Sequence, residues 1–347
     1  MKILLSARNQ AYSFDCPPDE PILYAGLRHG LELPYECATG TCGTCKARLI
    51  GGDVHDAWPE APGRSYLRRG GGELLMCQSV ARADCSLEVT NVVRPMPPGA
   101  CLAFAVGAAV RGVAPLTHDV VSLRLDLDQP VDFEAGQFMV MRVPGIPGWR
   151  AYSMANFDLR ARGVVFVVKK KPGGGVSEWL FGGDVEGTRV ELFGPLGRAT
   201  FHPHIARDLL CIAGGSGIAG MMAILARACR DRYFDRHAGR VFFGVRTQKD
   251  VFFLDELAAF KARHPDRLEV TVALSDEEVS PPLRAAHPEL AFATGLVHAV
   301  AGEGMRDGFQ NVRAYVAGPP PMVDAALRML LLDARLTADN IRYDRFS

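Results

Sequence analysis

The sequence of 347 residues lacks a net charge, because 39 lysines and arginines balance 39 aspartates and glutamates. Without an excess of cations, the chain has no overall field that would hold a nucleic-acid backbone or an anionic membrane. It also lacks an apolar N-terminal run and an uninterrupted hydrophobic stretch of the roughly 20 residues that a membrane span needs. We therefore predict a cytoplasmic protein with no nucleic-acid partner and no membrane span.

The chain has no internal repeat and no low-complexity tract, and its composition is that of an ordinary globular protein. A proline-rich segment, RPMPPGA, follows an alternating apolar run near residue 93 and is typical of a linker. The predicted organisation is therefore a first domain at 1–93, a linker at 94–101, and two further domains at 102–203 and 204–347. Each of these domains is long enough to form a core of its own.

The second and third domains differ in their hydrophobic patterns. The second has short β-type runs between glycine and proline turns, at 120–127, 137–143 and 164–168, which predicts an antiparallel β-barrel. In the third, apolar strands alternate with helices, which predicts a parallel α/β sheet covered on both faces. Ligands of such sheets bind at the carboxyl ends of the strands, so the loops after Ala213, Val245 and Ala317 are the predicted sites. The predicted strands are 209–213, 240–245, 268–274 and 314–317, and the predicted helices are 218–230, 251–263, 295–301 and 321–334.

Four of the nine cysteines have a distinctive spacing: Cys37, Cys42, Cys45 and, further along, Cys77. Two intervals of four and two residues followed by a distant fourth cysteine are typical of plant-type 2Fe–2S sites. Glycines in the loop permit a close approach of the backbone, and its threonines offer donors to sulfur. A structural zinc ion, which usually draws on two cysteine pairs, and a disulfide are the less favoured alternatives. We interpret the other five cysteines as small buried hydrophobic residues.

On the segments LPYECATGTCGTCKARLIGG and LLMCQS, residues 1–93 resemble a plant-type ferredoxin over their whole length. This resemblance implies a β-grasp fold with a 2Fe–2S cluster held by the four cysteines in a loop near the surface. Electrons would leave through that edge.

Two motifs of the middle domain, RAYS at 150–153 and GGVS at 174–177, resemble the flavin-binding barrel of the ferredoxin–NADP reductase superfamily. The resemblance implies that Arg150 and Ser177 hold a diphosphate, that Tyr152 lies along the isoalloxazine, and that Ser153 approaches flavin N5. A guanidinium suits phosphate oxygens, and glycines before a helix let a diphosphate approach its N-terminus. The domain order resembles the FAD-containing branch. The implied FAD-binding residues are Arg150, Tyr152, Ser153, Gly174, Gly175, Val176 and Ser177.

Three glycine-containing turns of the last domain resemble the NAD(P) site of the same superfamily. The implied nucleotide-binding residues are Gly214, Gly215, Ser216, Gly217, Arg246, Gly318 and Pro319. The chain departs from the family pattern at Gly220, where proline is frequent, and at Ala317, where cysteine is frequent. Asp250 follows Arg246 closely and would repel a 2′-phosphate, which favours NADH over NADPH. Phe346, next to the C-terminus, either anchors the core or shields the flavin, and both interpretations stay open.

The whole chain resembles the NADH reductases of bacterial multicomponent oxygenases, in particular those that serve toluene and xylene monooxygenases. The resemblance implies electron transfer from NADH through FAD and the cluster to the hydroxylase component or to a Rieske ferredoxin. No residue is expected to act as a general acid or base. The resemblance implies that Tyr152, Ser153 and Phe346 lie next to the flavin. The alternatives are the reductase of a Rieske-type dioxygenase and, less favoured, a redox sensor without catalysis.

Overall fold

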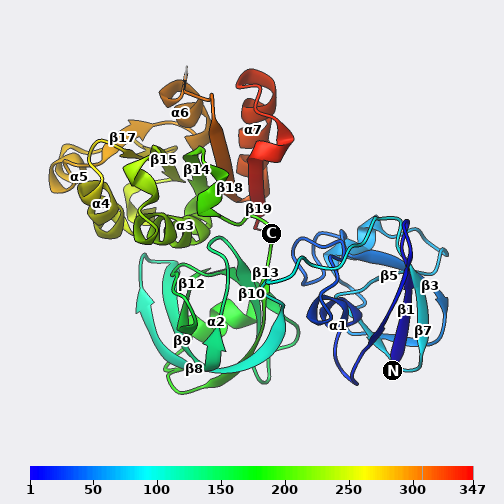
Figure 1. Ribbon diagram of the computed structural model, residues 1–347. Coiled ribbons are helices and arrows are strands. Elements are labelled where there is room, and N and C mark those ends of the chain that lie inside the picture. Colours follow the sequence, from blue (N-terminus) through cyan, green and yellow to red (C-terminus); the bar gives the residue numbers. More distant parts are fainter. Residues whose placement is uncertain (307, 347) are drawn as a thin grey trace. The chain divides into compact units, whose positions relative to one another are not determined.

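The computed structural model describes residues 1–306 and 308–346, which form two compact units (Figure 1). The first unit contains Met1–Ala108, Phe138–Tyr152 and Arg189–Leu196, and the second contains Ala109–Gln137, Ser153–Thr188 and Gly197–Ser347. None of the described helices is long and apolar enough to cross a membrane. The division into three domains at 1–93, 102–203 and 204–347 stays a prediction.

The N-terminal part of the first unit is a mixed five-stranded sheet with one short helix against it. The sheet order is β2-β1-β7-β3-β5, with β1 parallel to β7 and antiparallel to β2. Alternate residues of β1, Ile3 and Leu5, are buried beneath α1, all but one of whose residues are buried. This is the β-grasp arrangement that the ferredoxin resemblance implies. The elements are β1 (Lys2–Ser6), β2 (Ala11–Asp15), α1 (Ile22–Arg28), β3 (Lys46–Gly51), β4 (Val54–Asp56), η1 (Pro62–Tyr66), β5 (Glu73–Leu75), β6 (Ser79–Ala81) and β7 (Cys85–Glu88).

The second sheet has six strands in the order β11-β10-β13-β8-β9-β12. The pairs β9–β12 and β10–β13 are antiparallel, and an isolated bridge between Met154 and Phe166 connects the residue after β11 to β12. Since this bridge joins the two ends of the strand order, the prediction of an antiparallel barrel is confirmed. The elements are β8 (Phe104–Pro115), β9 (Val120–Val131), β10 (Phe138–Arg142), β11 (Arg150–Ser153), β12 (Ala161–Lys169), α2 (Gly175–Phe181) and β13 (Arg189–Leu196).

The third sheet is parallel throughout, in the order β17-β16-β15-β14-β18-β19. Alternate residues of β14 enter two separate cores: Leu209 and Cys211 pack with α3 and α4, and Leu210 and Ile212 pack with α6 and α7. The predicted doubly covered sheet is therefore confirmed. The elements are β14 (Asp208–Gly214), α3 (Ile218–Arg230), β15 (Gly239–Val245), α4 (Leu254–Arg263), β16 (Leu268–Leu274), α5 (Pro281–Ala286), β17 (Ala291–Thr294), α6 (Val297–Gly304), β18 (Val312–Gly318), α7 (Pro320–Arg328) and β19 (Ile341–Arg345).

Three predicted helices have different bounds in the structure. The helix predicted at 295–301 spans Val297–Gly304, so it begins and ends a few residues later. The helix predicted from residue 251 begins only at Leu254, because Phe253 has a left-handed backbone with φ 62° and cannot continue a helix. The helix predicted to reach residue 334 ends at Arg328 and continues as one π-helical turn, Met329–Asp333.

Candidate functional site

The four predicted cluster ligands lie together in the first unit, as two neighbouring pairs. The sulfurs of Cys45 and Cys77 are 3.2 Å apart, and the backbone N–H of Cys42 donates to the sulfur of Cys37 at 3.4 Å. A hydrogen bond with Cys45, burial and the negative charge of Cys45 and Cys37 all raise the pKa of Cys77. A set of four thiols in two pairs fits a two-iron cluster.

The loop presents its backbone donors to one of these sulfurs. The N–H groups of Thr39, Thr41 and Cys42 each lie 3.4 Å from the Cys37 sulfur. A hydrogen bond from the Cys42 thiol, together with these N–H groups, lowers the pKa of Cys37 to about 5. The thiolate is the form that binds metal, so the loop favours the ligating state of this residue. The Gln78 amide also lies 3.7 Å from the Cys77 sulfur, a contact that no sequence motif indicated.

Gly63 is a further residue of the cluster site that sequence reasoning missed. Its N–H donates to the Gly40 carbonyl at 2.9 Å, and a Cβ at this position would lie 2.7 Å from that oxygen and 2.8 Å from the Gly43 nitrogen. Both contacts are with backbone atoms of the cluster loop, so a side chain here would push the loop away. Only the folded structure brings this segment to the loop, and a lone glycine gives no signal of it in the sequence.

We expect Gly63→Ala to destabilise the chain by about 1–3 kcal/mol, the usual range for overpacking, and to lower its iron content. Iron analysis and urea unfolding followed by circular dichroism would measure both effects. Gly51→Ala is the matched control, because a Cβ at Gly51 meets nothing within 4 Å. Equal stability and iron content in the two variants would contradict this assignment.

The RAYS motif forms strand β11. In the first unit, the Arg150 guanidinium lies 6.0 Å from the centre of the Trp58 ring and donates to the Trp149 carbonyl at 2.9 Å. Burial raises the pKa of the half-buried Tyr152, and the nearby Arg150 opposes that shift. In the second unit, Ser153 is buried. Arg150 thus supplies a positive charge at a half-buried position, which suits a phosphate.

The GGVS motif contains the start of helix α2, with Gly174 as the residue before its first turn. The Ser177 hydroxyl accepts the Lys171 N–H at 3.0 Å and lies 2.9 Å from the Gly174 carbonyl, to which it can donate. The Ser177 hydroxyl therefore stabilises the loop between Lys171 and Gly174, which precedes the helix. Whether this loop, with Gly175 and Val176, also holds the diphosphate stays a prediction.

Two of the predicted nucleotide-binding turns lie against each other at the carboxyl ends of β14 and β18. A Cβ on Gly217 would be 2.2 Å from the Ala317 carbonyl oxygen, and a Cβ on Gly318 would be 2.9 Å from the Gly214 oxygen. Gly318 also has φ 149°, a conformation that side chains disfavour. Glycine is thus required where the two turns meet, while Gly215 and Ser216 stay half-buried beside them. Pro319 follows as the residue before α7, and Arg246 is exposed at the end of β15.

The C-terminal strand β19 reaches the same edge of the sheet. The Phe346 N–H donates to the Gly318 carbonyl at 2.9 Å, and its partly buried ring packs on the core. Asp344, which pairs with Ala317 in the sheet, lines a small hollow together with Ser153 and Gly220. Sequence reasoning missed Asp344, because the direction of its side chain depends on a strand that was not predicted.

Three sequence families match consecutive parts of the chain. Residues 7–82 match the 2Fe-2S iron-sulfur cluster binding domain, residues 108–201 the oxidoreductase FAD-binding domain, and residues 211–328 the oxidoreductase NAD-binding domain. The ferredoxin–NAD(+) reductase component of the alkene monooxygenase system of Xanthobacter autotrophicus is 35% identical, over 97% of this chain and 99% of that protein. The xylene/toluene monooxygenase electron transfer component XylA of Pseudomonas putida is 31% identical, over 93% of this chain and 87% of its own length.

The chain belongs to the oxygenase reductase family. A solved structure, the ferredoxin reductase in carbazole 1,9a-dioxygenase, covers 100% of this reductase and 99% of its own chain, with a TM-score of 0.85 and 34% identity. The predictions of fold class, of an electron-transfer oxidoreductase, and of FAD, 2Fe–2S and nicotinamide domains are confirmed.

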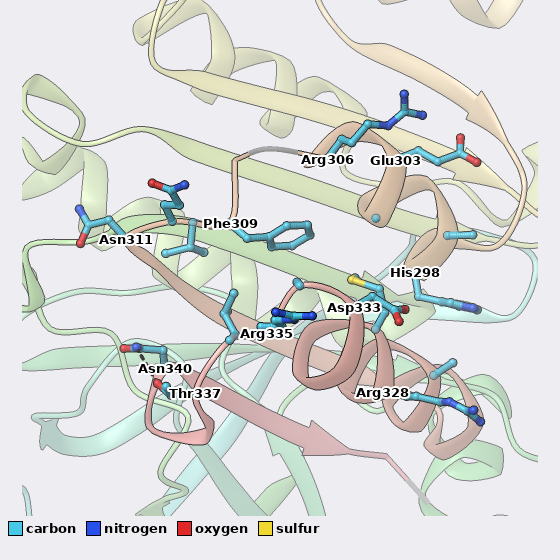
Figure 2. Close-up of a pocket in the computed structure, with 18 of the residues that line it drawn as sticks. His298, Glu303, Arg306, Phe309, Asn311, Arg328, Asp333, Arg335, Thr337 and Asn340 are labelled. Carbon is cyan, nitrogen blue, oxygen red and sulfur yellow. Dashed lines mark hydrogen bonds between the residues drawn. The ribbon is translucent and has the colours of Figure 1, made fainter.

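A pocket of about 930 Å³ lies at the opposite edge of the parallel sheet (Figure 2). It is lined near the start of β18 by Phe309 and Asn311, and by Arg306, Arg328 and Arg335. None of the predicted site residues lines it, so we assign it no part in the nucleotide site.

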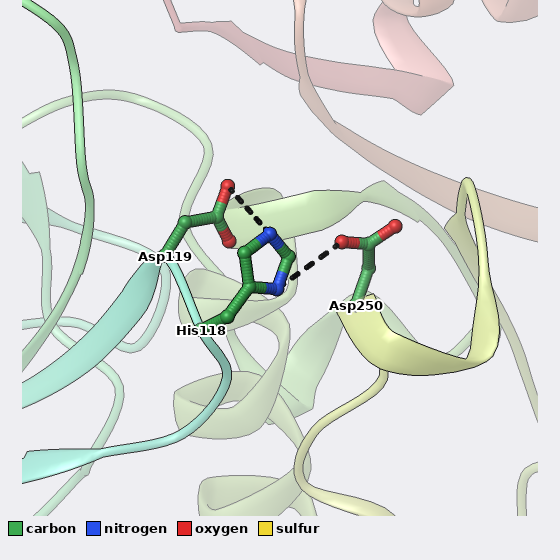
Figure 3. Close-up of side chains that lie close together, drawn as sticks. All are labelled: His118, Asp119 and Asp250. Carbon is green, nitrogen blue, oxygen red and sulfur yellow. Dashed lines mark ion pairs between the residues drawn. The ribbon is translucent and has the colours of Figure 1, made fainter.

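A second group of polar side chains joins the turn after β8 to the loop after β15 (Figure 3). The two ring nitrogens of His118 lie 4.0 Å from carboxylate oxygens of Asp119 and Asp250. The side chain of His118 is exposed, and distances of 4.0 Å are those of loose ion pairs, which contribute little to stability. We interpret the group as an electrostatic link between the two loops.

Proposed function

We propose that this reductase passes electrons from NADH to the hydroxylase component, or its ferredoxin, of an aromatic or alkyl-aromatic monooxygenase. The chemistry that bound FAD would supply is the conversion of a two-electron hydride from NADH into single electrons for the cluster. The observation that supports an outlet at the cluster is its uneven burial: Cys45 and Cys77 are buried, whereas Cys37 and Cys42 are half-buried. The chain's own role is to orient these groups and to leave one side of the cluster accessible.

Residues of the second unit would position the reacting ends of the two nucleotides. The turns at 214–217 and 318–319 would hold NADH at the carboxyl edge of the sheet, next to the hollow that contains Ser153 and Asp344. Phe346 is held at the same edge by its bond to Gly318, which is compatible with both a shield and a core anchor. No side chain has to transfer a proton for hydride transfer, so the contribution of these residues is orientation.

The preference for NADH rests on the loop after β15. One oxygen of Asp250 accepts hydrogen bonds from the Thr247 N–H at 3.0 Å and from the Thr247 hydroxyl at 2.9 Å. These bonds hold a negative charge close behind Arg246, where it would oppose a 2′-phosphate. The alkene monooxygenase relative is likewise described as an NAD(+) reductase.

The reductase of a Rieske-type dioxygenase is the second candidate function. It is favoured by the likeness to the ferredoxin reductase in carbazole 1,9a-dioxygenase, which covers the whole chain. Both candidates use the same cofactors, so the difference lies in the acceptor alone. We also propose a cytoplasmic location, where NADH is available and cysteines outside the cluster site, such as Cys85, stay reduced.

A panel of acceptors tests the proposed function. We expect NADH oxidation to be fastest with the hydroxylase, or its ferredoxin, of a toluene-type monooxygenase. The ferredoxin of a Rieske dioxygenase being reduced faster would favour the second candidate. If the reductase reduces none of these acceptor proteins faster than it reduces cytochrome c, both candidate functions would be contradicted.

We expect Arg150→Ala to bind FAD about tenfold or more weakly, because a charge-assisted hydrogen bond contributes roughly 1.5–3 kcal/mol. Fluorescence titration of the flavin-free protein with FAD measures the dissociation constant. Arg142→Ala is a control in the same unit, since Arg142 pairs with Glu191 on the neighbouring strand. Unchanged FAD affinity in Arg150→Ala would show that the motif has been assigned wrongly.

A further inference from the structure

The cluster loop has a side that the protein itself covers. Tyr24 of α1 is fully buried, and its hydroxyl donates to the carbonyl of Ala38, the residue after the ligand Cys37, at 3.1 Å. The Tyr24 ring stacks on Phe193 of β13, with 4.4 Å between the centroids, and meets the edge of Trp149 at 5.5 Å. An acceptor protein cannot approach the cluster through this packed aromatic group.

A second aromatic ring, that of Tyr66, lies over another part of the loop, at Gly43. A Cβ on Gly43 of the loop would lie 2.6 Å from a ring carbon of Tyr66, so the ring lies directly over the loop backbone. Even so, 63% of Tyr66 is exposed, which is unusual for an aromatic residue. The segment is held in place by the bond from Gly63 to the Gly40 carbonyl at 2.9 Å.

The segment that contains Tyr66 also has an excess of positive charge. Between Pro62 and Gly72 there are three arginines and no acidic residue. Arg64 is neutralised by an ion pair with Asp56. The side chain of Arg68 is 86% exposed and lies 3.9 Å from Glu73, a loose pair, and Arg69 is exposed as well. The exposed acidic residues nearest in sequence, Glu60 and Asp53, lie outside the segment, so within 62–72 itself no carboxylate offsets Arg68 and Arg69.

We propose that Tyr66, Arg68 and Arg69, here called the outer rim, are the docking surface for the electron acceptor, and that the acceptor presents an acidic face. This inference rests on the proposed function, since it describes the partner of the same cluster. The arginines attract an acidic face, and the exposed ring supplies a rigid apolar anchor in the middle of the contact. Docking there brings the acceptor to the half-buried ligands Cys37 and Cys42.

Charge reversal at the outer rim distinguishes weaker docking from damage to the cluster or the fold. It should change the reduction rates of acidic and basic acceptors in opposite directions, whereas damage would lower both rates. The double variant Arg68→Glu/Arg69→Glu is compared with Arg111→Glu. Arg111 is 70% exposed and, like Arg68, lies 3.9 Å from one carboxylate, that of Asp126, so it is an exposed arginine with a comparable loose ion pair. The probes are an acidic 2Fe–2S ferredoxin and the basic protein cytochrome c, each reduced with NADH at low ionic strength.

We expect the double variant to reduce the acidic ferredoxin about tenfold more slowly and cytochrome c several-fold faster, with both differences lost at high salt. Arg111→Glu should change neither rate. Tyr66→Ser should slow reduction of the ferredoxin while ferricyanide reduction and the cluster EPR signal stay unchanged.

An equal loss with both acceptors, no change with either, or the same effect in Arg111→Glu would overturn the outer rim as the docking surface. Because the probes are surrogate acceptors, this result is independent of the acceptor panel. If no oxygenase component of the acceptor panel is reduced rapidly but the charge-reversal variant behaves as expected, the proposed oxygenase partner is wrong. The outer rim would then still be the docking surface.

Discussion

Replacing Cys77 with serine will reduce NADH-dependent reduction of cytochrome c by on the order of 100-fold or more, while ferricyanide reduction continues. Cys77 is buried, with its sulfur 3.2 Å from that of Cys45, so a variant hydroxyl would have to replace a thiolate in a closed site. Ferricyanide takes electrons directly from flavin and therefore bypasses the cluster. Stopped-flow assays with the two acceptors measure this difference.

Cys85→Ser is the matched control for that experiment. Cys85 is also buried in the first unit, and its thiol lies 3.3 Å from the Asp53 carbonyl, an acceptor that a serine hydroxyl can also use. We expect this variant to keep both activities and the EPR signal of the reduced cluster. A normal EPR signal in Cys77→Ser would contradict the assignment of this residue as a ligand.

Removing the flavin while leaving the cluster in place will abolish NADH oxidation with every acceptor. A hydride carries two electrons and a proton and needs an organic acceptor, whereas the cluster accepts electrons one at a time. The cluster of the flavin-free protein should still be reduced by dithionite, which donates single electrons. We therefore expect a loss of more than 100-fold with NADH and a normal EPR signal after dithionite.

Adding flavins back makes this second prediction specific. FAD should restore activity and FMN should not, because the expected contact of Arg150 is with a diphosphate that FMN lacks. Measurable reduction of cytochrome c by NADH in the flavin-free protein would show that electrons reach the cluster by another route.

Local patterns allowed much of this fold to be predicted. The spacing of Cys37, Cys42 and Cys45 depends on one short loop, and the buried strand 268–274 and the helix 218–230 have the predicted bounds. In each case, the neighbours in sequence are also the neighbours that determine the structure. The parallel sheet followed from its fully apolar strands, which both faces bury.

The remaining features depend on contacts between segments far apart in the sequence. Gly63 matters because its segment returns to the cluster loop, and Asp344 lines the same small hollow as Ser153 only because β19 pairs with β18. Helix α4 begins later than predicted because Phe253 has a left-handed backbone. A bulky residue adopts this conformation only when its surroundings impose it. Such features require the folded chain and have no sequence signature.

The order of electron transfer is the central claim, and rapid mixing of the oxidised protein with NADH under anaerobic conditions tests it most directly. Flavin absorbance and freeze-quenched EPR spectra would be followed in the same samples. Our account predicts that the flavin band is lost first and that the EPR signal of the reduced cluster rises afterwards. A cluster signal that rises before the flavin absorbance falls would contradict it.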